Sequence, residues 1–392
     1  MKLLTLLLLL ALAPTRLFAQ AVPQGVILGD KAYVPQATET VCAARVGAIV
    51  PNPLGHFVLI ANQATLLSAT DPLRTMPAGG GKLLLWNSVT RQTKTVWQLP
   101  ASEDESYRVL FANIRWLPHT NKALVIADQV PISLPPGQTG PAPHRYTLVW
   151  VDAIAGTSRT LTSGPAALSL HVSGMGATWV RIQSDTPESH AVTENGSLGP
   201  VLTTAPAEEN ATADAPKLPL RLQVSTAMAT LTQTTRALHP LWLAVEESAA
   251  SPLPLLIASD AGRGVLLPDL SAVLYVGGET VGAGLYAVPL RSIRRDQFSQ
   301  AQAAARRQKS LSNAYQIAQA LLAYAAQNGG AMPSGSPATA LAPFFNGSDP
   351  FGDPDSGPLI LTLALNGGKT LGTITGPNGT IIINGDGGVS LQ

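Results

Sequence analysis

An internal repeat constrains the fold of this 392-residue chain more than any other feature. Residues 51–62 align with residues 117–128, and residues 83–96 align with residues 148–161, at an offset of 65 or 66 residues. Each copy consists of a polar turn, an apolar strand, a variable loop and a hairpin. Because a single sheet of this kind cannot bury both of its faces, repeated copies must stack on one another. The repeat therefore predicts a series of similar antiparallel sheets.

Weaker copies extend the pattern to about five units between residues 45 and 290. The composition agrees, because 45% of the residues are apolar and only 12% are charged, while 35 Gly and 32 Pro supply turns between many short strands. We expect the chain to be mainly β. The additional strand candidates lie at residues 177–181, 220–224, 241–245, 272–276 and 284–290.

The clearer copies resemble a known family. The Leu-Val-Trp-Val-Asp strand at 148–152 and the Gly-Thr-Ser-Arg-Thr-Leu-Thr return at 156–162 are similar to the WD40-like blades of periplasmic TolB and its relatives. That family has Ser-Pro-Asp-Gly at the turn, where this chain has Pro-Asn-Pro-Leu-Gly at 51–55 and Leu-Pro-His-Thr-Asn at 117–121. The resemblance implies a β-propeller-like domain over residues 22–289. A β-sandwich of unrelated hairpins is the alternative.

A 39-residue stretch without Gly or Pro, residues 290–328, predicts a long helix that ends before Gly329. Apolar residues in its second half recur at three- and four-residue steps, which predicts a packed face: Leu311, Tyr315, Ala318, Leu322 and Ala325. Its first half carries six basic residues against the single acid Asp296: Arg291, Arg294, Arg295, Arg306, Arg307 and Lys309.

Residues 329–392 are predicted to form a small β-rich head packed on this helix, with strands at 359–365, 370–375 and 380–384. The helix end, the Asp-Pro-Phe-Gly-Asp-Pro loop at 349–354 and the Asn-Gly-Asp-Gly-Gly turn at 384–388 resemble type II secretion pseudopilins. The resemblance implies a pseudopilin-like α+β head. The polar first half of the helix argues against the membrane-inserted helix of that family, because each central charge costs ~3 kcal/mol in hydrocarbon.

Residues 1–21 have the parts of a secretory signal peptide. Lys2 precedes an apolar run of 11 residues, Leu3–Ala13, and small residues such as Ala19 and Ala21 follow. The run is too short to cross ~30 Å of hydrocarbon. We therefore expect an exported, periplasmic or extracellular protein with no transmembrane segment in the mature chain. The single cysteine, Cys42, excludes an intramolecular disulfide.

Catalytic motifs are missing: the chain has no Gly-x-Ser-x-Gly, His-Glu-x-x-His or Cys-x-x-Cys sequence. We expect His56 and His119, at equivalent turns of the repeat, to be structural. The pseudopilin resemblance implies a calcium site at the aspartates of the head. However, aspartate before Pro or Gly is more typical of turns. No catalytic, cofactor-binding or metal-ligating residue is assigned, and no cofactor is expected. The residues considered are the histidines 56, 119, 144, 171, 190 and 239, and Asp349, Asp353, Asp355 and Asp386.

The charge balance, 25 Lys and Arg against 24 Asp and Glu, disfavours a nucleic-acid partner. The missing motifs favour an exported, non-catalytic binding or scaffold protein that contacts other envelope or extracellular proteins. The alternative is a secreted propeller hydrolase or lyase with its site in the central channel. A third hypothesis is a peripheral contact of the basic helix with anionic lipid or acidic polymer. Convergent polar groups with shifted pKa values would favour the enzyme.

Overall fold

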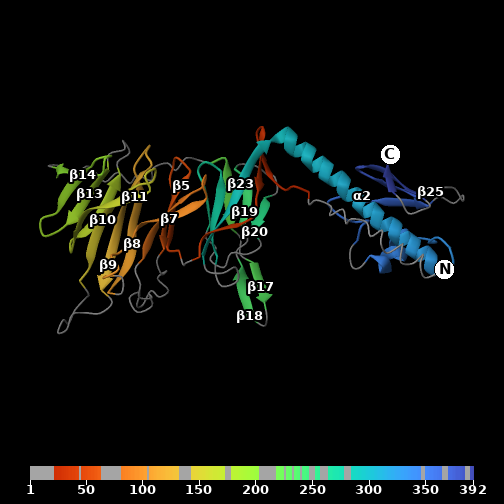
Figure 1. The fold of residues 1–392 in the computed structure, drawn as a ribbon, viewed down its shortest axis with the longest axis horizontal. Helices are drawn as coiled ribbons and strands as arrows, with labels where there is room; N and C mark the ends of the chain where they lie inside the picture. Colours follow the sequence, from red (N-terminus) through yellow and green to blue (C-terminus); the bar gives the residue numbers. More distant parts are fainter. Residues whose placement is uncertain are drawn as a thin grey trace, which may run out of the picture. The chain divides into compact units, whose positions relative to one another are not determined.

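The fold is mainly β, with one long helix and a small β region after it (Figure 1). The chain divides into two compact units, the larger formed by residues 26–28 and 33–292 and the smaller by residues 293–392 with short N-terminal segments. The predicted leader lies outside the described residues. The computed structural model describes residues 22–43, 46–62, 81–103, 106–131, 143–172, 178–202, 218–224, 227–231, 234–238, 241–246, 252–256, 264–277, 284–345, 349–363, 370–384 and 389–392.

Three consecutive four-stranded antiparallel sheets confirm the repeat, and each is formed by strands in chain order. Sheet 1 contains β4 (Ala48–Pro51), β5 (Phe57–Asn62), β6 (Lys82–Asn87) and β7 (Gln92–Trp97). Sheet 2 contains β8 (Tyr107–Trp116), β9 (Lys122–Pro131), β10 (Arg145–Asp152) and β11 (Thr157–Gly164). Sheet 3 contains β12 (Ala167–Val172), β13 (Thr178–Gln183), β14 (Glu188–Val192) and β15 (Leu198–Val201).

Two further sheets and a hairpin complete the larger unit within the described ranges. Sheet 4 contains β16 (Leu220–Val224), β19 (Leu241–Val245) and β20 (Leu253–Leu256), and β17 (Ala227–Leu231) forms a hairpin with β18 (Thr234–Leu238). Sheet 5 brings the two ends of the unit together, because N-terminal strands pair with β23. It contains β1 (Val26–Leu28), β2 (Lys31–Pro35), β3 (Glu39–Cys42), β21 (Gly264–Leu266), β22 (Ala272–Gly277) and β23 (Gly284–Arg294).

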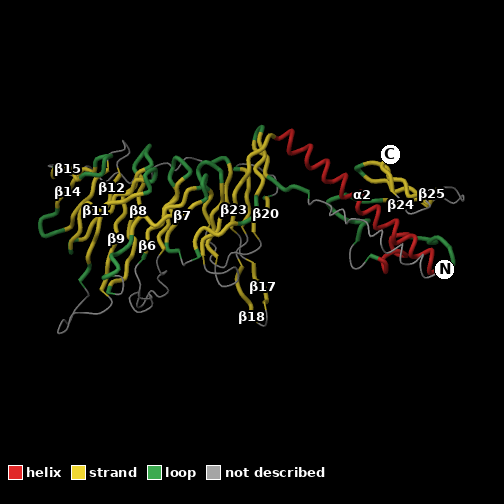
Figure 2. The backbone as a smooth tube through the Cα atoms, in the orientation of Figure 1, coloured by secondary structure: helices red, strands yellow, loops and turns green. Residues whose placement is uncertain are grey.

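The sheets of the larger unit stack face to face because their strands are apolar on both sides (Figure 2). On β9, Ile126 packs with Leu170 and Val180 of sheet 3, whereas its neighbours Val125 and Ala127 pack against sheet 1. Such alternation is a property of strands buried on both faces. Four buried clusters connect the sheets in the order 3, 2, 1, 5, 4. No cluster among the described residues joins sheet 3 to sheet 4.

Equivalent turns at one edge of the stack are tied to each other. His56, His119 and Leu270 all have a positive φ, between 56° and 65°, and lie in the turns that precede β5, β9 and β22. The His56 Nδ1 atom lies 2.9 Å from Asp269 Oδ2, which links the turns of sheets 1 and 5. The two predicted turn histidines therefore lie in equivalent turns of the repeat, at different positions within the turn.

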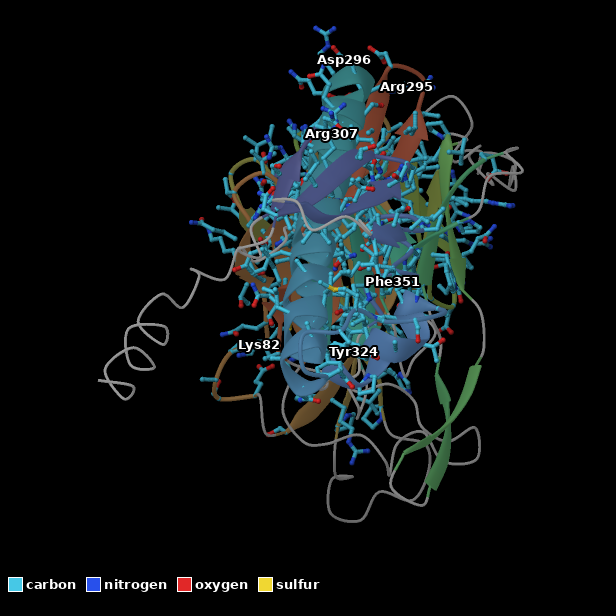
Figure 3. All side chains as sticks on the ribbon, turned by 90° about the vertical axis from the view of Figure 1, so that its right-hand side faces the viewer. Lys82, Arg295, Asp296, Arg307, Tyr324 and Phe351 are labelled. Atoms are coloured by element: carbon cyan, nitrogen blue, oxygen red, sulfur yellow. The ribbon has the colours of Figure 1, made fainter. Side chains whose placement is uncertain are left out.

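The long helix α2 spans Arg295–Gln327, so the predicted helix start at residue 290 differs from the structure. Residues 290–294 belong to β23, where residues 284–289 pair with β22. Arg291 and Arg294 therefore lie on a strand, while the exposed Arg295 and Arg307 lie on the helix (Figure 3). In the described chain, no helix combines the length and hydrophobicity needed to cross a bilayer.

The buried face of α2 agrees with the predicted one in part, since Ala318 is buried and Leu311 packs against the buried cluster of the head. It is centred on Ala314, Ile317 and Leu321, whereas Tyr315 and Leu322 are half-buried. The structure also buries the polar residues Ser310 and Asn313, which the spacing of apolar residues did not include.

The head packs its sheet on this face. Ile317 and Leu321 of α2 share a buried cluster with Ile374, Ile381 and Ile383. The head contains the short helices α3 (Pro337–Leu341) and η1 (Ala342–Phe344), then β24 (Ile360–Leu363), β25 (Thr370–Gly376), β26 (Gly379–Asn384) and β27 (Val389–Leu391). The predicted arrangement of a long helix followed by a small β region is confirmed.

Candidate functional site

An acidic side chain and a histidine meet where β9 ends and β10 begins. Asp128 lies near the end of β9, and His144 directly precedes β10. Because the two strands are antiparallel, with Tyr146 opposite Asp128, both residues come to the same end of sheet 2. The His144 Nδ1 atom lies 2.9 Å from Oδ1 and 3.1 Å from Oδ2 of Asp128. The Asp128 side chain is only 13% exposed, whereas that of His144 is 38% exposed and can reach a ligand.

Burial dominates the electrostatics of this pair. It raises the pKa of the Asp128 carboxyl above its ordinary value, and the hydrogen bond and charge of His144 offset only part of the increase. Burial, followed by the nearby Asp128 carboxylate, also raises the pKa of the Tyr146 hydroxyl. The Tyr146 ring stacks on His144 with 5.7 Å between the ring centroids. Ionisable groups perturbed by burial and by specific partners are typical of functional sites.

The carboxylate selects which imidazole nitrogen can react. Nδ1 of His144 points to Asp128, and among the described residues Nε2 has no hydrogen-bond partner. A histidine held at Nδ1 by a buried carboxylate keeps one tautomer and orientation, with Nε2 ready to accept or donate a proton. This pair can therefore perform general acid–base chemistry.

A second polar network lies on the opposite face of the same strand ends. Arg145 pairs with Glu103, and its Nε atom donates to Gln129 Oε1 at 2.6 Å. Gln129 is almost completely buried, and its amide donates to Thr147 Oγ1 at 2.7 Å, which in turn lies 2.9 Å from Ser163 Oγ. Because these donors and acceptors satisfy one another, we assign the network a structural role that fixes the ends of β9 and β10.

The repeat itself carried a signal for this site that motif searching missed. Asp128 aligns with Asn62 of the first copy, and His144, Arg145 and Tyr146 align with the glycines at 79–81. The second copy thus replaces a neutral residue and three glycines with ionisable and aromatic side chains. Side chains at the strand ends lie outside the stacked core, so they can differ between repeat copies and add a function without disturbing the packing.

The other described histidines make contacts of a structural kind. His171 stacks on the buried Trp179 with 4.0 Å between centroids, and His190 Nδ1 lies 3.0 Å from the carbonyl oxygen of Gly199. His239 lies outside the described residues.

The acidic residues of the head act in turns and in an ion pair. Asp353 accepts hydrogen bonds from Asn313 at 3.1 Å and from its own loop, and Lys309 Nζ lies 3.2 Å away. Although burial raises the pKa of Asp353, these partners outweigh it and lower the pKa below the ordinary value. Asp349 Oδ1 accepts from the Phe351 amide at 3.0 Å, and Asp386 lies outside the described residues. The structure groups no three His, Cys, Asp or Glu residues as metal ligands within its described ranges.

A shallow depression of about 340 Å³ lies elsewhere, between β7 and β11. Its lining contains no ionisable side chain, so it offers no acid–base chemistry. The lining residues are Thr95, Val96, Trp97, Gln98 and Ser158.

No protein-family model and no curated protein matches the sequence, so neither the TolB-like nor the pseudopilin-like resemblance gains support from a family. Weak similarity to solved structures exists. The GH43 BlXynB protein from Bacillus licheniformis is 9% identical, with a TM-score of 0.23 over 56% of this chain and 43% of that chain. The oligogalacturonate lyase from Vibrio parahaemolyticus is 10% identical, with a TM-score of 0.24 over 68% and 96%.

A mannose phosphorylase from Leishmania mexicana, MPT-4, is 10% identical, with a TM-score of 0.21 over 69% of this chain and 88% of that chain. This chain spans about half the length of the GH43 proteins that it matches. TM-scores this low establish neither fold nor activity, and the account of the stacked sheets depends on their own packing.

Proposed function

We propose that the protein is a hydrolase or lyase in which His144 is the general acid–base and Asp128 positions it. The observation that carries this proposal is the 2.9 Å contact between His144 Nδ1 and a carboxylate that is only 13% exposed. Asp128 holds a proton on Nδ1 and leaves Nε2 to take a proton from water, a hydroxyl or an acidic carbon. This proposal replaces the channel site expected for a propeller enzyme with a site at the strand ends of sheet 2.

Tyr146 supports the same chemistry by holding the imidazole. Its ring lies almost parallel to that of His144, at an interplanar angle of 19°, and it belongs to the buried edge of the cluster between sheets 2 and 3. A histidine held by a carboxylate on one side and an aromatic ring on the other loses little freedom when a substrate binds. Positioned proton transfer of this type contributes roughly 10²- to 10⁴-fold to a rate.

The test compares two histidines that each pair with an aspartate at 2.9 Å, His144 at the candidate site and His56 at the turn of sheet 1. Wild type, His144→Gln and His56→Gln are assayed on p-nitrophenyl esters and glycosides, and on polysaccharides by the ultraviolet absorbance of unsaturated products. We expect His144→Gln to lower turnover by about 10²-fold or more and His56→Gln to leave it within twofold. Equal activity of all three proteins, or no turnover by folded wild type, would contradict the proposal.

A non-catalytic binding or scaffold function is the second candidate, and a specific observation favours it. The first half of α2 exposes Arg295, Arg306 and Arg307, while Asp296 pairs with Arg294 (Figure 3). An exposed group of arginines favours an acidic partner surface, such as another envelope or extracellular protein. Affinity capture from the native envelope with wild type and with the triple Arg→Gln variant tests this function. Equal recovery of a partner by the wild type and the variant would contradict binding through the arginines of the helix.

Export remains part of the proposal for either function. It predicts that protein recovered outside the cytoplasm begins after Ala19 or Ala21, which N-terminal sequencing measures. Recovery of an intact Met1 terminus on exported protein would contradict cleavage at these positions.

A further inference from the structure

An arginine that has no hydrogen-bond or ion-pair partner among the described residues lies beside the Asp128–His144 pair. Arg108 lies on β8 opposite Val130, and Leu110, two residues later, lies opposite Asp128. Directly opposed residues share a face and side chains alternate along a strand, so Arg108 and Asp128 are diagonal neighbours on one face of sheet 2. Diagonal neighbours in an antiparallel pair are about 7–8 Å apart. A substrate group of a few atoms can span that separation.

The face that carries these residues is the one turned toward sheet 3. Ile126 and Leu148, which have the same strand parity as Asp128 and Tyr146, pack in the cluster that sheet 2 shares with sheet 3. Tyr146 and Leu168 are half-buried members of that cluster. The ionisable end of the face therefore has an apolar wall beside it, which excludes water from part of the site and strengthens charge interactions there.

Within the described ranges, the Arg108 guanidinium lacks partners of the kind that Arg145 and Arg91 have. Its Nε atom is buried without a hydrogen bond, and among the described residues no side chain or carbonyl pairs with the guanidinium. By contrast, Arg145 at the same strand ends pairs with Glu103 and Gln129, and Arg91 pairs with Glu39. A buried donor without a partner costs about 1–3 kcal/mol, and more when it is charged. Arginine cannot avoid that cost by losing its proton.

We infer that Arg108 binds an oxyanion, a carboxylate or a phosphate, on the substrate whose reacting atom lies at His144 Nε2. The guanidinium fork matches such groups with two parallel hydrogen bonds, which anchors the substrate at a fixed distance from the base. This inference rests on the proposed function and adds the substrate class: the substrate is acidic. It also gives a role to a cation at an end of sheet 2 where no described residue pairs with it.

The test uses two anions and a neutral analogue of one of them. Succinate, its neutral diamide succinamide, and inorganic phosphate are titrated while the His144 ring signals are followed by NMR. We expect succinate or phosphate to shift these signals and succinamide to leave them unchanged. Signals that respond to phosphate alone identify a phosphate subsite, and signals that respond to succinate alone identify a carboxylate subsite. Equal responses to succinate and succinamide, or no response to either anion, would overturn the inference.

Two variants of the same strand separate a specific subsite from general surface charge. Arg108→Gln removes the proposed ligand, whereas Arg115→Gln removes the exposed Arg115 from β8 and serves as the matched control. We expect Arg108→Gln to weaken anion binding at least tenfold and Arg115→Gln to change it less than twofold. Because Arg108 has no partner among the described residues, Arg108→Gln should unfold at a urea concentration no lower than wild type, so a loss of binding is not a loss of folding. Unchanged anion binding by Arg108→Gln would overturn the inference.

The inference and the proposed function fail in different ways. His144→Gln is expected to abolish turnover while leaving anion affinity within about threefold, because the guanidinium remains. If anion binding depends on Arg108 but turnover does not depend on His144, the subsite stands and the catalytic proposal fails. If turnover depends on His144 while Arg108→Gln binds and turns over substrate normally, the enzyme stands and the acidic substrate class is wrong.

Discussion

Asn313 in the middle of α2 is expected to hold the long loop of the head in place. Its side chain is only 3% exposed, and its Nδ2 atom donates to Asp353 Oδ2 and to Ser356 Oγ, both at 3.1 Å. Asn378 completes the contact from the sheet by donating to Ser310 Oγ at 2.9 Å and to the Ser356 carbonyl oxygen at 2.8 Å. Asn313→Ala removes one donor from the centre of this network.

The magnitude follows from what the two acceptors lose. A hydrogen bond to a charged acceptor contributes about 1.5–3 kcal/mol and a neutral one about 1 kcal/mol, and both acceptors would remain largely buried. Alanine is the better helix former, which returns at most about 0.7 kcal/mol. The lost hydrogen bonds outweigh this gain, so we expect Asn313→Ala to lower the free energy of unfolding of the smaller unit by about 2–3 kcal/mol.

The two units can be observed separately in the full chain. All six tryptophans belong to the larger unit, whereas α2 of the smaller unit is the long helix that dominates circular dichroism at 222 nm. In urea, the 222 nm transition of Asn313→Ala should move by about 1 M or more, and tryptophan fluorescence should not move. Gln316→Ala, at an exposed position of the same helix, is the control. Equal 222 nm midpoints for Asn313→Ala and Gln316→Ala would refute the reasoning.

Three further predictions concern charge and packing. Because the pKa of Asp353 is lowered in the folded state, its carboxylate stabilises the folded head above the ordinary pKa of 3.8, and this stabilisation is lost as the pH falls through the lower folded pKa. Urea unfolding followed at 222 nm should show this loss for wild type and not for Asp353→Asn. Because the pKa of Asp128 is raised in the folded state, its carboxyl favours folding below pH 3.8, and this contribution is lost as the pH rises through the folded pKa. Asp128→Asn should therefore become more stable relative to wild type from acidic to neutral pH. Urea unfolding followed by tryptophan fluorescence measures this difference, and the opposite trend would contradict the prediction. Ile126→Ala, in the cluster between sheets 2 and 3, should cost about 2–5 kcal/mol, whereas Ile154→Ala, at a position that is 75% exposed, should change stability by less than about 0.5 kcal/mol in the same assay.

Regular elements could be predicted from the sequence where local signals were strong. The strand Phe57–Asn62 lies in the aligned segment 51–62, where the polar turn and the apolar side chains that follow it predict a strand. The helix was recognisable because Gly and Pro are missing over its whole length. Its start was displaced, since residues 290–294 have no local signal that distinguishes the end of β23 from the start of α2.

Features that depend on distant partners could not be predicted. The strands β1, β2 and β3 carry no copy of the repeat, and their place in sheet 5 is fixed because β2 and β3 pair with β23 and β1 pairs with β2. On α2, Asn313 looks solvent-exposed by residue type, and the loop that buries it begins about 36 residues later, at Asp349. Burial of a polar side chain is decided by such partners rather than by its own sequence neighbours.

The candidate site was hidden for a related reason. Asp128 and His144 are 16 residues apart, and they meet because β9 and β10 pair in a register that places Asp128 opposite Tyr146. Arg108 lies near them because β8 is ten residues long and begins at Tyr107, well before the aligned repeat segment 117–128. No short motif contains these residues. The comparison of the two repeat copies nevertheless singles out Asp128, His144 and Tyr146, but not Arg108.

The most direct test of the account measures kcat and KM separately for wild type, His144→Gln and Arg108→Gln on one acidic substrate. A base acts in the transition state and an anchor acts in binding, so we expect His144→Gln to lower kcat by about 10²-fold or more with little change in KM, and Arg108→Gln to raise KM about tenfold or more. Values of kcat/KM within twofold of wild type for both variants would contradict a functional site at this end of sheet 2.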